Sequence, residues 1–174
     1  MIHLEKVTRD NVDDVIELRV AREQKDFLPS NVESLADAYL ALTEGRPVYP
    51  FAILNGKKVV GFIMIDYAHD WSGYEHEAWI CSDEYKFYKD KPYYYIWRFM
   101  IDKRFQGRGY GREAIRQAIE FVKTFPCGEA KYCVLSYSPT NEVAKKFYES
   151  VGFVEINGPG YYEENDERSA VLKL

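Results

Sequence analysis

A segment rich in glycine and arginine carries the clearest chemical signal in this sequence. It spans residues 104–112, with the sequence RFQGRGYGR, and follows an almost continuously apolar run. Glycines allow a backbone to approach a ligand and to turn its N–H groups toward it, and a helix start adds partial positive charge. Arg104, Arg108 and Arg112 add fixed positive charge. The segment therefore predicts a binding site for a pyrophosphate group.

Two other phosphate-binding motifs do not match this segment. A Walker A loop requires GxxxxGK[ST], which the sequence lacks. The dinucleotide fingerprint requires GxGxxG, whereas Gly107, Gly109 and Gly111 alternate with other residues. A plain strand-to-helix turn with solvated arginines is the alternative interpretation.

A second motif lies downstream, and the two together resemble a known family. Residues 106–111 match [Q/R]-x-x-G-x-[G/A], the pyrophosphate motif of the GNAT superfamily of acetyl-CoA-dependent N-acetyltransferases. Residues 141–153, with the sequence NEVAKKFYESVGF, look like that family's N-x-x-A-x-x-[F/L]-Y-x-x-x-G-F segment. The two motifs come in the family's order and at its separation. The resemblance covers essentially the whole chain.

The resemblance implies an α/β (α+β) fold in a single domain over residues 1–174. In this fold a central mixed, mostly antiparallel sheet of about seven strands is flanked by four helices. Hydrophobic periodicity along the chain gives the same order, β-α-α-β-β-β-α-β-α-β-β.

Three local patterns fix particular elements. Asn55-Gly56 between apolar runs predicts a hairpin, and Tyr93 to Ile101 predicts an interior strand covered on both faces. A helix is expected from near Ser34, with Asp37 completing a weak capping box. Another is expected from Pro139, with four side chains on its buried side. These four are Val143, Ala144, Phe147 and Tyr148.

The resemblance also implies where acetyl-CoA binds. The expected site is a V-shaped gap between the strands that end near Ile101 and near Ser136. Backbone groups at the end of the first strand would hold the pantetheine arm, and the glycine turn would hold the pyrophosphate. The cofactor-binding residues so expected are Phe99, Met100, Ile101, Gln106, Gly107, Arg108, Gly109, Tyr110, Gly111, Arg112 and Asn141.

Tyr148 is the catalytic residue that the resemblance implies. A phenol is protonated at neutral pH, so Tyr148 can protonate the departing sulfur as a general acid. The N–H of Met100 or Ile101 would stabilise the oxyanion. The alternatives are core packing for Tyr148 and helix capping for Asn141. The general base stays open, and the candidates by position are Asp66, His69, Glu75, Glu77 and His76.

A second, weaker resemblance narrows the choice of acceptor amine. The chain is similar to bacterial spermine/spermidine (diamine) acetyltransferases. The resemblance rests on Gln24, Phe27, residues 31–39 and residues 97–102. Residues 66–90 also hold seven acids against two lysines, interleaved with aromatic side chains that suit a polyamine's ammonium groups. An ordinary solvated loop explains them equally well. The expected substrate-binding residues are Glu75, Glu77 and Trp97.

Other acceptors and other classes of protein remain open. A GNAT enzyme could acetylate a protein N-terminus, a lysine, an amino acid or an antibiotic, and an acetyl-CoA-binding regulatory module would need no catalysis. A metal protein would have to use His69, Asp70, His76 and Cys81, whose spacing fits no known ligand signature. We therefore expect no metal.

Composition bounds the remaining possibilities. The chain has 174 residues, a formal net charge of −5 and 47% hydrophobic residues, which suits one globular domain. The acidic balance opposes a nucleic-acid partner. The N-terminus lacks the apolar core of a signal peptide, and no run is long enough to span a membrane. We expect a cytoplasmic protein that acts on a small amine, has no membrane partner and can form a homodimer.

Overall fold

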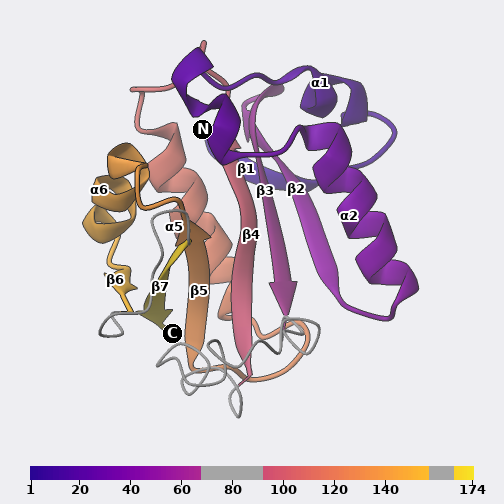
Figure 1. Ribbon diagram of the computed structural model, residues 1–174. Coiled ribbons are helices and arrows are strands. Elements are labelled where there is room, and N and C mark those ends of the chain that lie inside the picture. The colour runs from indigo at the N-terminus through magenta and orange to yellow at the C-terminus, as the bar shows by residue number, and fades with distance from the viewer. Residues whose placement is uncertain (68–91, 157–166) are drawn as a thin grey trace.

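A seven-stranded sheet forms the centre of the protein (Figure 1). The computed structural model describes residues 1–67, 92–156 and 167–174. Along the sheet the strand order is β1-β2-β3-β4-β5-β7-β6, and within these residues only β4 and β5 pair in parallel. The strands are β1 Ile2–Lys6, β2 Val48–Asn55, β3 Lys58–Tyr67, β4 Tyr93–Ile101, β5 Tyr132–Tyr137, β6 Val154–Glu155 and β7 Arg168–Lys173.

Helices cover both faces of this sheet. α1 and α2 pack on one face over β2 and β3, whereas α5 packs on the other over β1 and β4, as Figure 1 shows. The described helices are α1 Val12–Glu17, the 3-10 helix η1 Arg22–Phe27, α2 Asn31–Thr43, α5 Tyr110–Val122 and α6 Glu142–Ser150. The predicted GNAT-type fold and element order are therefore confirmed.

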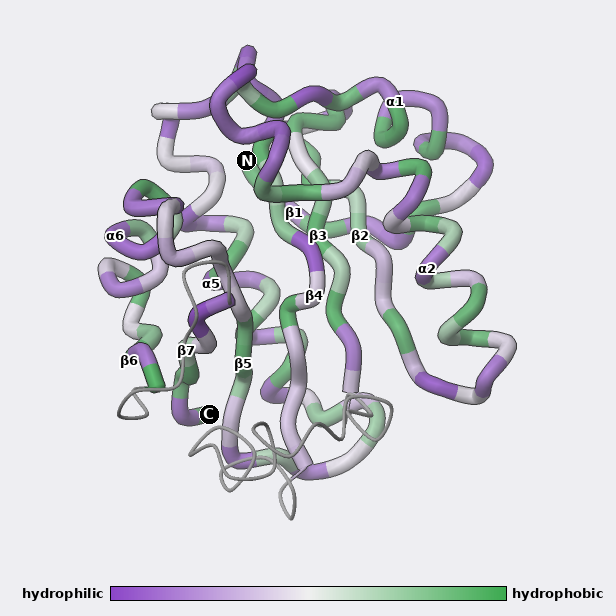
Figure 2. The backbone as a smooth tube through the Cα atoms, in the orientation of Figure 1, coloured by the Kyte–Doolittle hydropathy of each residue, from purple (hydrophilic) through white to green (hydrophobic). Residues whose placement is uncertain are grey.

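Amphipathic sequence places the helices. Along α5, side chains three and four residues apart are buried, and the tube in Figure 2 alternates between hydrophobic and hydrophilic colours there. The buried set is Ala114, Ile115, Ala118, Ile119 and Val122. Each large member buried in this way contributes about 1.5–3 kcal/mol relative to exposure. Within the described residues, no helix is long and apolar enough to cross a bilayer.

The predicted hairpin and interior strand are both present. Gly56 has a φ of +62° between β2 and β3, a conformation that glycine adopts without steric cost. β4 covers Tyr93–Ile101, the range that its sequence predicts. Periodicity and turn chemistry are strong at both places, so local sequence was sufficient to define them.

The starts of two helices were predicted wrongly. α2 begins at Asn31, not near Ser34, because Ser30 Oγ accepts the N–H of Glu33 at 3.2 Å and Glu33 accepts the N–H of Ser30 at 2.8 Å. This reciprocal pair is a capping box four residues upstream of the expected one.

α6 was the second helix whose start was misplaced, since it begins at Glu142 and not at Pro139. The Asn141 side chain caps it by accepting the N–H of Ala144 at 3.1 Å. Val143, expected on the buried side, is instead 72% exposed in the first turn of α6.

β4 and β5 part from each other halfway along β4. Their register runs from Tyr93↔Tyr132 to Ile96↔Leu135 and stops there. Beside the last pair, β4 carries a bulge: Met64 and Ile65 of β3 face Arg98 and Ile96, which leaves Trp97 as the extra residue. The edge of β4 over residues 97–101 is therefore not paired with β5, and peptide groups there are available to a ligand.

Candidate active site

A cavity of about 720 Å³ occupies the gap between β4 and β5. Its wall includes side chains from both faces of the sheet: Phe99 and Tyr148 belong to the core under α5, whereas Tyr95 and Trp97 lie on the other face. Every expected cofactor residue except Arg108 lines this cavity. Those that do are Phe99, Met100, Ile101, Gln106, Gly107, Gly109, Tyr110, Gly111, Arg112 and Asn141.

The glycine turn closes one end of the cavity and leads into α5. Gly107 and Gly109 have φ values of +73° and +78°, so both positions favour glycine, and Gly109 is the N-cap of α5. Gln106 fixes the turn: its Nε2 donates to Ile101 O at 2.9 Å and to Gln24 Oε1 at 2.8 Å. The backbone is thus set to present N–H groups and a helix N-terminus to an anion.

The three arginines of the turn have different surroundings. Arg112 lines the cavity and donates to Ser150 O at 2.8 Å and to Ser150 Oγ at 2.9 Å, which ties the turn to the end of α6. Arg108 donates to Arg104 O at 3.1 Å, and Arg104 pairs with Asp102 at 2.8 Å. Arg112 is therefore the arginine of this turn that contacts the cavity.

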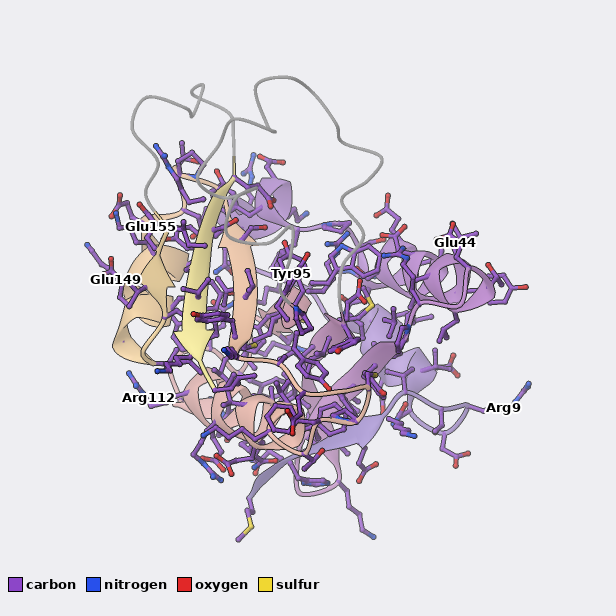
Figure 3. All side chains as sticks on the ribbon, turned by 90° about the horizontal axis from the view of Figure 1, so that it is seen from below. Arg9, Glu44, Tyr95, Arg112, Glu149 and Glu155 are labelled. Carbon is purple, nitrogen blue, oxygen red and sulfur yellow. The ribbon has the colours of Figure 1, made fainter. Side chains whose placement is uncertain are left out.

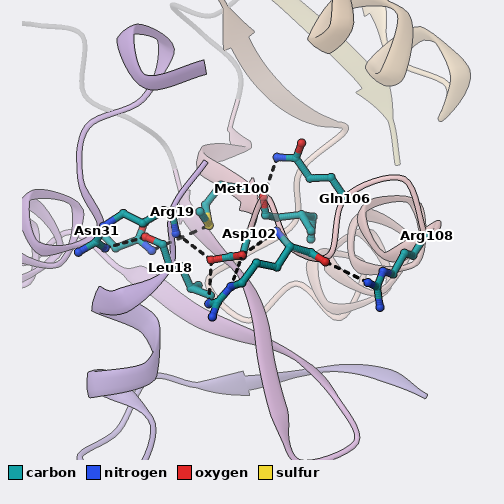
Figure 4. Close-up of polar contacts among 9 residues, drawn as sticks. Leu18, Arg19, Asn31, Met100, Asp102, Gln106 and Arg108 are labelled. Carbon is teal, nitrogen blue, oxygen red and sulfur yellow. Dashed lines mark hydrogen bonds and ion pairs between the residues drawn. The ribbon is translucent and has the colours of Figure 1, made fainter. Parts of the chain in front are cut away.

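Asp102 anchors the start of the turn, as the dashed lines in Figure 4 show. Its carboxylate is 1% exposed and accepts the backbone N–H groups of Arg19 and Arg104, at 2.9 Å each, and the Arg104 guanidinium. Burial alone would raise the pKa of Asp102, but these hydrogen bonds outweigh it and lower the pKa to about 2. The charged carboxylate thereby joins the segment after α1 to the end of β4. This role could not be predicted from local motifs, because it depends on a contact across 83 residues.

Tyr148 lies on α6 in a cluster of aromatic rings. The rings of Phe99, Tyr137, Phe147 and Phe153 have centroids 5.3–6.5 Å from its own. Burial, with a smaller contribution from the negative charge of Glu167, raises the pKa of Tyr148 above its usual value. The phenol is thus protonated throughout the physiological pH range and can donate a proton into the cavity.

Asn141 has the capping role that was its alternative interpretation. Its Oδ1 accepts the Ala144 N–H at 3.1 Å, and the residue also lines the cavity. A cap of this kind leaves the side-chain amide nitrogen able to donate to a ligand. The two interpretations are therefore compatible.

Trp97 lies between two guanidinium groups. The Cζ atoms of Arg98 and Arg46 are 5.1 and 5.6 Å from the centre of its ring. Arg98 also donates to Asp37 at 3.3 Å, which ties the bulge of β4 to α2. Trp97 lines the cavity as expected, and its ring is already engaged by cations of the chain.

A smaller cavity of about 360 Å³ adjoins the first beneath η1 and the start of α2. The two share wall residues such as Leu28, Pro29 and Met100. In the part of the chain that the structure describes, no acid lines it, whereas three cationic residues do: Arg19, Lys25 and Arg98. Sequence reasoning missed this basic wall, since the three residues come from separate elements.

A polar group on the β5 side was also missed. Ser136 of β5 and Glu167, just before β7, line the main cavity beside Tyr95. The Tyr95 hydroxyl lies 2.6 Å from Ser136 Oγ, and Ser136 donates to the Glu167 carboxylate. Antiparallel pairing of β5 with β7 brings these residues together, which no local motif encodes.

Several expected residues lie outside the described part of the chain. Glu75 and Glu77 are among them, as are the base candidates His69 and His76 and the metal candidates Asp70 and Cys81. Asp66 is described: it is buried and pairs with Arg46 at 3.3 Å, and it does not line the main cavity. In the described ranges, no group of three His, Cys, Asp or Glu side chains could hold a metal ion.

Comparison with known families decides what this arrangement belongs to. A sequence model described as the acetyltransferase (GNAT) family matches residues 12–153. The chain belongs to the GNAT family. It is therefore an N-acetyltransferase, and the unpaired edge of β4 and the glycine turn fit an extended CoA-type molecule. Spermine/spermidine N(1)-acetyltransferase of Bacillus subtilis (strain 168) is 26% identical to this GNAT enzyme over 174 residues, covering 99% of each chain.

Two solved structures share the fold of this GNAT enzyme. Spermidine N-acetyltransferase from Vibrio cholerae, in complex with CoA and spermine, matches 99% of this chain and 95% of its own, with a TM-score of 0.64 and 16% identity. Arabidopsis thaliana Naa50, in complex with the bisubstrate analogue CoA-Ac-MVNAL, matches 98% of this chain and 96% of its own, with a TM-score of 0.59 and 18% identity. One was solved with CoA and spermine and the other with a single bisubstrate analogue that carries a peptide, so the fold by itself does not identify the acceptor.

Proposed function

We propose that this enzyme transfers the acetyl group of acetyl-CoA to a primary amine of a polyamine such as spermidine or spermine. The observation that carries the proposal is the match to the Bacillus subtilis spermine/spermidine acetyltransferase, which extends over 99% of both chains. Residues 1–174 would act as one catalytic domain in a cytoplasmic protein.

The cosubstrate would bind along the unpaired edge of β4. Backbone groups of residues 99–101 would hydrogen-bond the amides of the pantetheine arm, because β5 does not pair with that stretch. The N–H groups around Gly107 and Gly109, together with the Arg112 guanidinium, would bind the pyrophosphate. Asn141 would donate from its amide nitrogen to the pantetheine side.

Tyr148 would act as the general acid. A neutral amine attacks the thioester carbonyl, a backbone N–H of Met100 or Ile101 stabilises the negative charge on the oxygen, and Tyr148 protonates the departing sulfur. Its raised pKa means that the phenol carries its proton at neutral pH, as a general acid must. The aromatic rings around it exclude water, which favours transfer over hydrolysis.

One observation favours a second class of acceptor. The smaller cavity beside the site carries the cationic residues Arg19 and Lys25 and, among the described residues, no acid. Such a wall repels a polycation and attracts a carboxylate. An amino acid or a peptide with an acidic group is therefore the alternative acceptor.

The test is CoA thiol release from acetyl-CoA with amines offered in parallel. Spermidine, spermine, a short diamine, a lysine peptide, an acidic peptide and several amino acids form the panel. The proposal expects the highest kcat/KM with a polyamine. Preference for an acidic peptide or an amino acid would support the alternative, and acetyl-CoA binding without any transfer would indicate a regulatory module.

A homodimer is part of the proposal, by analogy with family members. Light scattering at micromolar concentration should give about twice the chain mass of 20.4 kDa. A monomer mass would remove the dimer from the proposal and leave the reaction untouched.

A further inference from the structure

Among the described residues, Glu167 is the one acid that lines the main cavity. It lies directly before β7 and its side chain is exposed. Its carboxylate accepts a hydrogen bond from Ser136 and, in the described residues, forms no ion pair with a lysine or arginine. An unpaired negative charge in the cavity of an enzyme that acts on amines is a natural partner for an ammonium group.

Hydrogen bonds connect the Glu167 carboxylate to the Ser136 hydroxyl and the Ser136 hydroxyl to the Tyr95 hydroxyl. Ser136 gives its one proton to Glu167, so the Tyr95 hydroxyl, 2.6 Å away, donates to Ser136. Tyr95 and Ser136 share a face of the sheet because residues alternate along β4 and β5, and Figure 3 shows Tyr95 next to β5 in the middle of the sheet.

The three oxygen atoms and the aromatic cluster of Tyr148 lie on opposite walls of the cavity. Tyr148 belongs to the core under α5, whereas Tyr95 belongs to the cluster on the other face. Both nevertheless line one cavity, and the charge of Glu167 is close enough to raise the pKa of Tyr148. An acetyl group held in the β4–β5 gap would therefore have a proton donor on one side and an anionic group on the other.

We infer that Glu167, Ser136 and Tyr95 form the subsite that receives the ammonium group of the acceptor amine and accepts its proton. The carboxylate and the serine hydroxyl can accept N–H groups of an ammonium, and the Tyr95 hydroxyl holds Ser136 in place by donating to it. This inference rests on the proposed acetyl transfer to an amine. It identifies the residues of the chain that accept the proton lost by the ammonium group.

The protons balance in the following way. The ammonium gives one proton to the Glu167 carboxylate, either directly or by way of the Ser136 hydroxyl, which passes its own proton on. The neutral nitrogen forms the C–N bond as the C–S bond breaks, and the sulfur takes the proton of Tyr148. The second nitrogen proton leaves to solvent, and Tyr148 regains one from solvent. Glu167 releases its proton to water because its side chain is exposed.

Other groups near Glu167 do not replace it in this role. Tyr95 and Tyr148 are phenols that stay neutral at physiological pH. The neighbouring Arg168 pairs across the sheet with Tyr137, and its charge acts on that phenol. Glu155 accepts from Tyr137 at 2.7 Å, has Lys145 3.7 Å away and does not line the cavity.

The test compares Glu167→Gln with the matched control Glu149→Gln in the full chain. Glu149 lies on α6 at the edge of the molecule in Figure 3, and its replacement changes the net charge equally. With the preferred amine at pH 7, we expect Glu167→Gln to lower kcat/KM about 100-fold or more. Acetyl-CoA affinity should stay within threefold, and Glu149→Gln should match the parent enzyme.

The pH dependence separates this role from a structural one. Near pH 9.5 more of the amine is already neutral, so the deficit of Glu167→Gln should shrink at least tenfold from its value at pH 7. An equal deficit at both pH values, or kcat/KM within threefold of the parent at pH 7, would overturn the inference. Ser136→Ala, expected to lose about tenfold with the same pH trend, decides the matter should Glu167→Gln fail to fold. A parent enzyme inactive with every amine would overturn the proposed function itself.

Discussion

Gln24 and Gln106, 82 residues apart, join η1 to the glycine turn through a hydrogen bond of 2.8 Å. Gln24 Oε1 also accepts the N–H of Ala21 at 3.1 Å, and Gln106 Nε2 also donates to Ile101 O. One amide pair therefore connects η1 with the turn proposed to bind pyrophosphate. Both residues line the main cavity.

Gln24→Leu should loosen the glycine turn without unfolding the protein. We expect KM for acetyl-CoA to rise about three- to tenfold, because Gln106 loses one of its two acceptors and the turn is less well ordered. The free energy of unfolding should fall by about 1 kcal/mol or less, the usual value for one exposed hydrogen bond. Steady-state kinetics and urea unfolding would measure both. The neighbouring Glu23→Leu is the control, and an unchanged KM for Gln24→Leu would show that the pair does not order the turn.

Tyr148→Phe should separate catalysis from binding. The change keeps the ring among Phe147, Phe153 and its other aromatic neighbours, and in the described residues the hydroxyl makes no hydrogen bond that would be lost. We expect kcat to fall about 100-fold while the Kd of acetyl-CoA stays within threefold. Tyr39→Phe, at a position 67% exposed on α2, is the control. A kcat equal to that of the parent would remove Tyr148 as the acid.

Gly109→Glu should abolish binding of acetyl-CoA. The position has a φ of +78°, which costs a non-glycine residue about 1–2 kcal/mol, and the new carboxylate would repel a pyrophosphate. Gly45→Glu is a matched control, because Gly45 has a φ of +80° after α2 and does not line the cavity. Calorimetric titration should show binding by the control alone. Binding of acetyl-CoA by Gly109→Glu with parental affinity would mean that the turn is not the pyrophosphate site.

Local sequence was sufficient for the elements that carry strong periodicity or turn chemistry. It located β4 and the hairpin at Gly56, and the two family motifs picked out residues that line one cavity. It failed where a nearby alternative existed, as at Ser30, whose capping box with Glu33 starts α2 early. It also missed Asp102 and Glu167, because both depend on pairing between distant segments. Such contacts follow from strand order and register, which a single sequence does not display.

The buried Asp102 should make stability depend on pH in the acid range. Its pKa of about 2 in the folded protein lies below the ordinary 3.8, so the ionised form stabilises the fold above about pH 4. That stabilisation, about 2 kcal/mol, is lost as the pH falls from 4 to 2. Asp102→Asn should therefore lower the free energy of unfolding by about 2 kcal/mol at pH 7, and the difference from the parent should shrink to below about 1 kcal/mol at pH 2.5. Urea unfolding at both pH values measures it.

The control for this prediction is Asp26→Asn, an exposed acid in η1. It removes the same charge without touching the backbone N–H of Arg19 or the Arg104 guanidinium that Asp102 binds. If Asp102→Asn cost no more stability at pH 7 than this control, the hydrogen bonds at Asp102 would not hold the segment after α1 to the end of β4. A deficit that persisted unchanged at pH 2.5 would assign the loss to packing and not to the charge, since most of the stabilisation that depends on the charge is lost by that pH.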